Sequence, residues 1–317
     1  MRILVSPVLL APLFASAAVT LFALNDAAMK LLSGDYALHQ LVMIRCIVAL
    51  GVVFGLMVPL SGGWRVLRMQ RPGLHVLRAG CVIFANLTFF LGLAALPLAE
   101  ATAIFFVGPF LITIFSVVFL GETVGRRRWV AVAVGLAGVL IVLRPGTTTF
   151  QPAAVLPLAA AVGYAALSIF TRYMRATENA VSMTFSIQFV FLVVTIVLGL
   201  TIGDGKFAAQ ENPSLAFLFR AWVWPAAGDW PIIAALGGFA SIGGYFVTQA
   251  YRLGEAALVA PFEYLALPLS IVFGIAFFGE RPDAVAWAGI LLIAGSGLYT
   301  AWRENQTGRV AGVRRRG

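Results

Sequence analysis

The chain has 317 residues, of which 61% are hydrophobic and 11% are charged, whereas soluble globular proteins carry about 25% charged residues. So much apolar surface excludes a water-soluble fold. At roughly 20 apolar residues per membrane span, the length allows about ten spans with short loops and leaves no room for a large soluble domain. We therefore predict an all-α integral membrane protein. The net charge of +9 comes largely from arginines between and after the apolar segments, which argues against a nucleic-acid partner.

The sequence offers no pattern for a metal or cofactor. Cys46 and Cys81 lie inside apolar stretches without CxxC spacing or clustered histidines, so we expect neither a metal site nor a disulfide framework. The glycine pairs at 237–238 and 243–244 lack a GxxxxGK[ST] motif and a neighbouring strand pattern. Close packing of helices accounts for them better than nucleotide binding does.

Apolar runs bounded by glycine, proline and charge predict ten transmembrane helices. The first contains Asn25, Asp26 and Lys30 and is too long for a signal peptide, so we interpret it as a retained span. The one long loop is predicted at 204–228. The predicted spans cover residues 8–32, 38–60, 74–96, 99–121, 127–143, 152–174, 180–203, 229–251, 255–279 and 283–302.

The distribution of cations predicts the orientation of the chain. With the N-terminus in the cytoplasm, fifteen lysines and arginines fall on the inner side and four on the outer side. Cytoplasmic loops carry the excess of lysine and arginine in membrane proteins. Both termini should therefore be cytoplasmic, with a basic tail at 303–317, in the inner membrane of a bacterium.

The two halves of the sequence carry matching landmarks. Each pair of landmarks is separated by 155 to 158 residues, and the pairs are Glu100 and Glu255, Glu122 and Glu280, and Trp129 and Trp287. Because each half holds five spans, an odd number, the second half must cross the membrane in the opposite sense. We predict two inverted repeats, 8–143 and 152–302, an architecture typical of secondary transporters whose site lies between the halves.

Several motifs carry a family resemblance. They are AEATA at 99–103 with Gly121-Glu122, AYR at 250–252, GEAA at 254–257, APFEY at 260–264, and NDAAMK at 25–30 followed by Tyr36, Gln40 and Arg45. With these motifs the chain resembles the EamA-type members of the drug/metabolite transporter superfamily over nearly its whole length. The first-span residues are similar to the branch that includes riboflavin and S-adenosylmethionine carriers.

The resemblance implies ten helices in two EamA repeats around a central cavity, lined mainly by spans 1, 3, 4, 6, 8 and 9. Spans 5 and 10 would be peripheral, where similar proteins sometimes form homodimers. The implied partners are a small-molecule substrate and membrane lipid. The resemblance leaves the cargo open.

Charged residues inside the predicted spans are the first candidates for the site, because each costs about 2.5 to 3.5 kcal/mol to insert. Asp26 and Lys30 are four residues apart and share a helix face, and Arg45 lies at a similar depth in the next span. The three can form a triad. This triad either contacts the substrate or is an ion-pair network within the first hairpin.

Glu263 is the candidate for proton coupling. It lies about eight residues, or roughly 12 Å, into the ninth span with no cation in that span, and Pro261 and Pro268 flank it. Backbone broken by proline at membrane depth is tolerated where it lines a cavity. Glu263 and Tyr264 are thus expected at the cavity, although a protonated structural glutamate is the alternative.

Uncharged polar and aromatic residues complete the candidate cavity. Asn86, Tyr164, Tyr245 and Gln249 could orient a ligand or join helices. Phe105, Phe106 and Tyr264 could stack on a flat ring. The candidate interior charges are nearly balanced, which favours a zwitterionic, cationic or flat aromatic metabolite over a bare anion.

Two other kinds of protein remain as alternatives to a transporter. A membrane-embedded enzyme acting on lipid would need a convergent catalytic group, whereas His39 and His75 are predicted near opposite membrane faces without a catalytic companion. A channel or sensory module would need a charged ring or a signalling domain. A secondary transporter without a catalytic role is therefore the predicted function.

Overall fold

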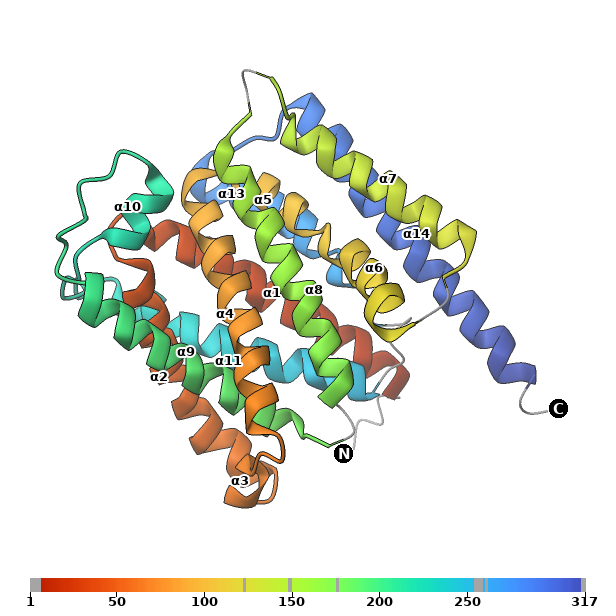
Figure 1. Cartoon of the computed structure of the whole chain (residues 1–317), viewed down its shortest axis with the longest axis horizontal. Coiled ribbons are helices and arrows are strands. Elements are labelled where there is room, and N and C mark those ends of the chain that lie inside the picture. Colours follow the sequence, from red (N-terminus) through yellow and green to blue (C-terminus); the bar gives the residue numbers. More distant parts are fainter. Residues whose placement is uncertain are drawn as a thin grey trace, which may run out of the picture.

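The computed structural model describes residues 7–121, 124–147, 150–174, 177–253, 259 and 262–314, with only the backbone of a few residues near the ends of these ranges. Every regular element within these ranges is a helix (Figure 1). The all-α prediction is confirmed. The predicted start of the ninth span, Glu122, Glu255 and Pro261 lie outside the described residues.

The helices of the first half follow the predicted apolar runs. Pro72 is the first residue of α4 and Pro109 the second residue of α6, positions in the first helical turn where the missing N–H of proline costs no hydrogen bond. The elements are α1 (Pro7–Leu32), α2 (Leu38–Val52), a π-helical stretch (Val53–Met57), α3 (Val58–Leu60), a short 3₁₀ helix (Trp64–Leu67), α4 (Pro72–Ala95), α5 (Leu98–Phe105), α6 (Gly108–Leu120) and α7 (Arg126–Leu143).

The second half is built in the same way. Asn179 caps the start of α9 by accepting a hydrogen bond from the backbone N–H of Ser182 at 2.9 Å, and Asn212 caps α10 similarly. The elements are a 3₁₀ turn (Pro152–Ala154), α8 (Val155–Met174), α9 (Ala180–Ile202), α10 (Pro213–Phe219), α11 (Trp230–Leu253), α13 (Ala266–Phe278) and α14 (Ala284–Arg314).

Seven helical segments among the described residues are long and apolar enough to cross a membrane. Two shorter apolar helices, Ala266–Phe278 and Ala284–Thr300, follow them. The seven are Leu10–Leu32, Leu38–Leu60, Pro72–Ala95, Leu98–Phe119, Pro152–Thr171, Val181–Ile202 and Trp230–Val247. The multi-pass architecture is therefore confirmed at this coarser level.

Two helical stretches, one in each half of the sequence, are interrupted by two non-helical residues at corresponding places. The first breaks at Phe106 and Val107, between α5 and α6, and the second at Tyr264 and Leu265, just before α13. The helix after each break has 13 residues. Each then ends at a glycine with φ of +67°, Gly121 and Gly279, a left-handed conformation that favours glycine.

The structure differs from the sequence-based prediction in two places. The long loop contains α10, which begins after the Asn212 cap. α14 continues to Arg314, so the predicted tail is helical to that residue instead of starting as a tail at 303. Hydropathy marks where a helix leaves the membrane, but the helix itself continues where the backbone remains in helical hydrogen bonding.

The most extensive contacts between helices join the two halves of the chain. α1 packs on α11, α4 on α8, α2 on α9, and α7 on α14. Figure 1 shows α7 and α14 side by side at one edge of the bundle, with the end of α14 extending beyond it. The main buried core runs through both halves and includes Leu41, Phe89, Leu93, Phe191 and Leu267.

Glycines allow the closest of these contacts. A Cβ at Gly237 of α11 would lie 2.4 Å from Val48 of α2, and one at Gly243 would lie 3.1 Å from Phe22 of α1. This confirms the packing role expected for these two glycines. At the α7–α14 contact, a Cβ at Gly138 would lie 2.9 Å from the carbonyl oxygen of Gly289. The helices expected to form a homodimer, α7 and α14, thus pack on each other within one chain through these small residues.

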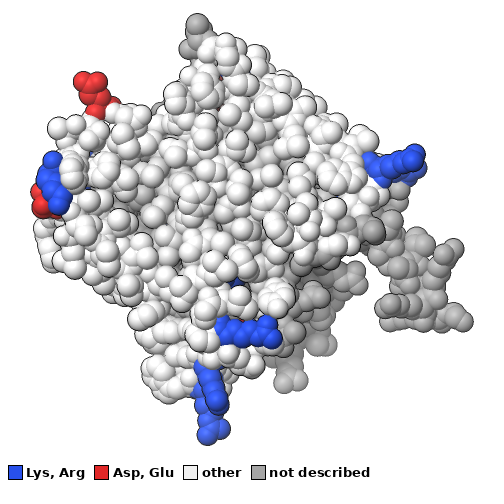
Figure 2. Space-filling view, viewed as in Figure 1, with Lys and Arg blue, Asp and Glu red and all other residues white. Residues whose placement is uncertain are grey.

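The outer surface is consistent with immersion in lipid. Figure 2 shows that the charged side chains on the visible face lie toward its margins, while its broad middle is uncharged. Large apolar side chains on several helices are exposed, among them Leu13, Ile47, Phe84, Leu140, Leu200 and Leu291. In water such a surface would cause aggregation, whereas lipid tails solvate it.

Candidate functional site

An aromatic cluster lies beside the break between α5 and α6. Phe105, the last residue of α5, packs on Phe89 of α4 with ring centroids 5.0 Å apart and on Tyr164 of α8 at 5.4 Å. A Cβ at Gly108, the first residue after the break, would lie 3.5 Å from the Tyr164 ring. This distance is an ordinary van der Waals contact, so the start of α6 lies directly against Tyr164. The structure brings the predicted residues Phe105 and Tyr164 together and adds Phe89.

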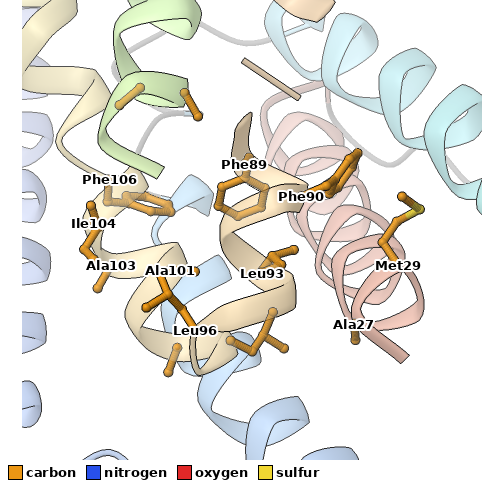
Figure 3. Packing of buried hydrophobic residues seen from close by; sticks show 14 of the residues in the cluster. Ala27, Met29, Phe89, Phe90, Leu93, Leu96, Ala101, Ala103, Ile104 and Phe106 are labelled. Carbon is orange, nitrogen blue, oxygen red and sulfur yellow. The ribbon is translucent and has the colours of Figure 1, made fainter. Parts of the chain in front are cut away.

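A second aromatic contact joins the two breaks. Phe106 packs on Tyr264 with ring centroids 5.2 Å apart and planes inclined by 48°. Figure 3 shows the ring of Phe106 pointing toward Phe89 on α4, whereas Phe90 points the other way, toward Met29 of α1. The hydroxyl side of Tyr264 lies against α14, where a Cβ at Gly297 would come within 1.9 Å of the Tyr264 oxygen. Tyr264 is therefore held between α14 and the first break.

Glu263 is half-buried and immediately precedes the second break. Its charge acts on the hydroxyl of Tyr164, the tyrosine that also packs on Phe105. Phe105 and Glu263 each stand directly before a break; Phe105 packs on Tyr164, and Glu263 acts on it electrostatically. The predicted residues Phe105, Tyr164, Glu263 and Tyr264 thus lie around the two breaks.

Asp26 and Arg45 form a second polar group on α1 and α2. Asn25 donates a hydrogen bond from Nδ2 to Asp26 Oδ1 at 3.2 Å, and the charge of Arg45 acts on the Asp26 carboxylate. The Arg45 guanidinium lies between the rings of Phe90 and Phe191, at 5.5 Å and 5.3 Å from their centroids. These cation–π contacts stabilise a cation away from water. Arg45 Nε has no hydrogen-bond partner among the described residues.

Lys30 does not complete the triad expected from its spacing to Asp26. Its Nζ pairs with Glu280 Oε1 at 2.6 Å and donates a hydrogen bond to the carbonyl oxygen of Leu96. Glu280 Oε2 accepts a hydrogen bond from the backbone N–H of Leu98 at 2.8 Å. The pair therefore joins the end of α1, the turn between α4 and α5, and the end of α13. The i, i+4 spacing identified a shared face but not the stronger partner, which comes from the other half.

The other predicted polar residues lie apart from the breaks or use their polar groups locally. Asn86 donates a hydrogen bond from Nδ2 to the carbonyl oxygen of Val82, one turn earlier in α4, at 3.1 Å. Tyr245 on α11 is 41% exposed and packs on its neighbour Phe246. Gln249 is half-buried on the same helix.

His75 has partners that the sequence did not reveal. Its Nδ1 lies 2.8 Å from Ser186 Oγ, and its Nε2 lies 3.1 Å from Glu178 Oε2. Ser186 also donates a hydrogen bond to the carbonyl oxygen of Met183, and Glu178 accepts two backbone N–H groups, so both partners of His75 are bound to the surrounding backbone. The sequence predicts no catalytic companion for His75 and does not indicate these two polar neighbours. The three residues are far apart in the sequence, and no local spacing links them.

The loop at 203–229 is hydrogen-bonded to the turn between α1 and α2 and to the start of α2. Tyr36 donates a hydrogen bond to Asp229 Oδ2 at 2.6 Å, and Gln40 exchanges two hydrogen bonds with the backbone of Val223. The hydrogen bond to Asp229 raises the pKa of Tyr36 above its usual value. This loop therefore covers the same end of the bundle as the Lys30–Glu280 pair.

Comparison with known proteins identifies the family. A sequence model of a protein family, described as the EamA-like transporter family, matches residues 9–144 of this chain. A riboflavin transporter of Rhizobium johnstonii is 31% identical over 242 residues, which cover 76% of this chain and 74% of that protein. The chain belongs to the EamA-like transporter family. The membership predicted from the sequence motifs is thereby confirmed.

Other relatives of this EamA-like transporter carry related names. A riboflavin transporter of Brucella anthropi is 28% identical and spans 78% of this chain and 83% of that protein. An S-adenosylmethionine uptake transporter of Rickettsia felis is 27% identical, spanning 77% of this chain and 76% of that protein. A solved structure described only as "Crystal structure of protein" shares the fold, with a TM-score of 0.61 and 22% identity over 90% of this chain and 94% of the other.

These relationships define the general function. The EamA-like transporter is a multi-pass protein of the bacterial inner membrane that moves small metabolites, and it is not an enzyme. The lipid-modifying enzyme considered from the sequence is not favoured. The aromatic cluster at the breaks and the polar pair Asp26 and Arg45 are the groups from which a substrate site can be built.

Proposed function

We propose that this EamA-like transporter carries a metabolite with a planar nitrogen heterocycle, bound against the aromatic rings of Phe105 and Tyr164 at the paired helix breaks. The observation that carries the proposal is the cluster of Phe89, Phe105 and Tyr164, whose rings pack at tilts of 53° and 57°, with the charge of Glu263 acting on Tyr164. Aromatic rings stabilise a stacked planar ligand by about 0.5–1.5 kcal/mol per pair beyond burial. A carboxylate beside them can accept the N–H groups of a heterocycle.

The names of the relatives support the same class of substrate. Riboflavin and S-adenosylmethionine differ in size and charge, but both contain a planar nitrogen ring system attached to a polar chain. Asp26 and Arg45 offer opposite charges within electrostatic reach of each other, which suits a polar or zwitterionic tail. Asn86, Tyr245 and Gln249 remain candidates for contacts with such a tail.

The proposed transport mechanism is alternating access by two inverted five-helix repeats, 8–143 and 152–302. The two breaks, the equal 13-residue helices after them, and the left-handed glycines Gly121 and Gly279 support the repeat. The helix contacts support it too. Exchanging the halves converts the α1–α11 contact into α8–α4, α2–α11 into α9–α4, and α1–α13 into α8–α6, all of which occur.

Two contacts lie on the axis of this exchange, because α2–α9 and α7–α14 each convert into themselves. Such an arrangement allows one half to rock against the other around a site at the breaks. The Lys30–Glu280 pair joins elements of both halves and would separate when that end opens. One chain suffices for this mechanism, since the small-residue faces of α7 and α14 contact each other.

The proposed topology has ten spans and both termini in the cytoplasm. Single cysteines at Glu211 and Arg127, both exposed, test it in a background with Cys46 and Cys81 replaced by alanine. An impermeant maleimide added to intact cells should label the Glu211→Cys variant and not the Arg127→Cys variant. The opposite labelling pattern would reverse the orientation.

A binding panel tests the substrate class. Purified protein is heated with riboflavin, S-adenosylmethionine, adenosine, amino acids or amines, and a bound ligand raises the unfolding temperature by mass action. We expect stabilisation by at least one planar heterocycle. Phe105→Leu should weaken that binding about two- to tenfold, whereas Phe119→Leu, which alters a 67% exposed ring outside the cluster, should not. Stabilisation by amino acids or amines alone would refute the proposed class.

A further inference from the structure

The segment between α3 and α4, residues 61–71, forms a basic strap at one end of the bundle. It includes the 3₁₀ helix Trp64–Leu67 and the three arginines Arg65, Arg68 and Arg71. The transport mechanism gives these cations no role. Figure 2 shows exposed basic side chains along the lower part of the molecule, where Figure 1 places α3.

The backbone of the strap is fixed from the turn between α8 and α9. Glu178 Oε1 accepts hydrogen bonds from the backbone N–H groups of Gln70 at 2.9 Å and Arg71 at 2.8 Å. Asn179 donates a hydrogen bond from Nδ2 to the carbonyl oxygen of Val66 at 2.8 Å. Burial alone would raise the pKa of Glu178, but His75 and the two backbone N–H groups lower it below its usual value. The carboxylate is therefore ionised and committed to the strap.

The three arginines of the strap differ in their surroundings. The Arg71 guanidinium lies 5.7 Å from the centroid of the Tyr173 ring. Arg65 and Arg68 make no side-chain hydrogen bond or ion pair with any residue that the structure describes. They flank a pocket of about 640 Å³, lined by Arg65, Arg68, Met69, Gln70 and Asn179. This pocket presents two cations and two amides but no carboxylate among its described lining residues, so it favours an anion.

Exposed apolar side chains lie close to the pocket's arginines in the sequence. Leu56, Leu60 and Trp64 are 52%, 75% and 69% exposed, and the Trp64 ring packs on Phe54. Exposed leucines indicate contact with lipid tails, and tryptophan prefers the level of the lipid headgroups. The pocket therefore lies at the height of the phosphates, with an apolar surface next to it.

We propose that Arg65 and Arg68 bind the phosphate of an anionic phospholipid, whose acyl chains run over Leu56 and Leu60. Arginine presents several N–H donors in a planar fork that fits phosphate oxygens. A lipid with a zwitterionic headgroup fits less well, because none of the described residues lining the pocket is acidic and could pair with its ammonium group. The site is separate from the proposed substrate cavity. With both termini in the cytoplasm, as proposed, it faces the cytoplasmic leaflet, and only this placement rests on the proposed orientation.

Native mass spectrometry of the detergent-solubilised full chain, titrated with phosphatidylglycerol, tests this site. A basic residue near an anionic lipid contributes roughly fivefold to binding, so Arg65→Gln/Arg68→Gln should weaken binding by at least about tenfold. The matched control Arg126→Gln/Arg127→Gln removes the same charge from another exposed position and should change it less than about twofold. The single variants Arg65→Gln and Arg68→Gln, each expected to lose about fivefold, test the same pocket if the double variant folds poorly.

Three results would overturn the proposal. An equal loss in the control would mean that net charge, not the pocket, binds the lipid. Phosphatidylcholine binding as tightly as phosphatidylglycerol would remove the basis for anion selection. Displacement of the lipid by millimolar inorganic phosphate or glycerol phosphate would identify a site for free phosphate instead. Because detergent solution has no sides, these outcomes do not depend on the proposed orientation or on the transported substrate.

Discussion

Phe106 and Tyr264 pack ring against ring, with centroids 5.2 Å apart, and each stands in the break of its own helical stretch. The contact joins the two halves where the backbone of both is irregular. Broken backbone in a membrane protein is tolerated where protein or a cavity surrounds it. The paired rings therefore mark the place where substrate binding and movement between the halves can meet.

The fit of Tyr264 against α14 predicts an asymmetry between two nearby glycines. A Cβ at Gly297 would come within 1.9 Å of the Tyr264 oxygen, whereas one at Gly295 would meet no atom within 4 Å. Gly297→Ala should destabilise the fold by about 1–3 kcal/mol through overpacking and should lower transport. Gly295→Ala should be neutral or slightly stabilising, because alanine has the higher helix propensity. Thermal unfolding in detergent measures both, and equal effects would contradict this placement of Tyr264.

The partner of Lys30 predicts which residues are energetically coupled. In a double-mutant cycle, Lys30→Met and Glu280→Gln should show a coupling of about 0.5–3 kcal/mol, because each single change leaves a buried group without its partner. The cycle of Lys30→Met with Asp26→Asn should be additive to within about 0.5 kcal/mol. A larger coupling to Asp26 than to Glu280 would restore the triad expected from the sequence.

These two cases show what the sequence could and could not predict. Apolar runs located most of the described helices to within a few residues, because insertion into lipid demands long apolar segments whatever the fold; α14, which continues to Arg314, is the exception. Pro268 indicated irregular backbone near the observed break at Tyr264 and Leu265. The Lys30–Glu280 and His75–Glu178 pairs were not predictable, since their partners are brought together only when distant helices pack.

The candidate site was predicted in part. Phe105, Tyr164, Glu263 and Tyr264 lie around the breaks, whereas Phe89 was missed because an aromatic residue in an apolar helix has no local mark of function. Lys30 was predicted to lie beside Asp26 because their spacing along one helix indicates a shared face. Spacing does not indicate the direction in which a long side chain turns. Neighbours on other helices decide that direction.

The Arg144–Asp283 pair predicts a pH dependence outside the membrane. The hydrogen bond from Arg144 lowers the pKa of Asp283 from 3.8 to about 2. A lowered carboxyl pKa means that the pair stabilises the fold fully above about pH 4 and loses its contribution as the pH falls toward 2. Asp283→Asn should therefore cost at most about 1 kcal/mol at pH 7, since Asp283 is largely exposed.

Unfolding at several pH values tests this dependence. Asparagine keeps the side-chain oxygen that accepts the backbone N–H of Ala286, so the start of α14 remains capped and only the charge is lost. The difference in stability between the parent and Asp283→Asn should shrink as the pH falls from 4 to 2. A difference that grows at low pH would contradict the pairing.

Glu263 is the proposed coupling residue, and a substitution separates coupling from binding. Glu263→Gln keeps the size and a hydrogen-bonding amide but cannot titrate. It should abolish accumulation driven by a pH gradient while retaining exchange of substrate across the membrane. Glu211→Gln, which removes an exposed carboxylate from the loop at 203–229, serves as the control. Unchanged, pH-dependent accumulation by Glu263→Gln would exclude Glu263 as the coupling site.

Counterflow in proteoliposomes tests most directly whether a carrier binds its substrate at the paired breaks. Liposomes containing the purified protein are loaded with an unlabelled planar heterocycle, riboflavin first, and labelled substrate is added outside. We predict a transient, saturable accumulation of label with the parent and with Phe119→Leu, and a clearly smaller one with Phe105→Leu and Tyr164→Phe. Absence of counterflow for every ligand that stabilises the protein, or equal counterflow in all four proteins, would contradict the proposed site and mechanism.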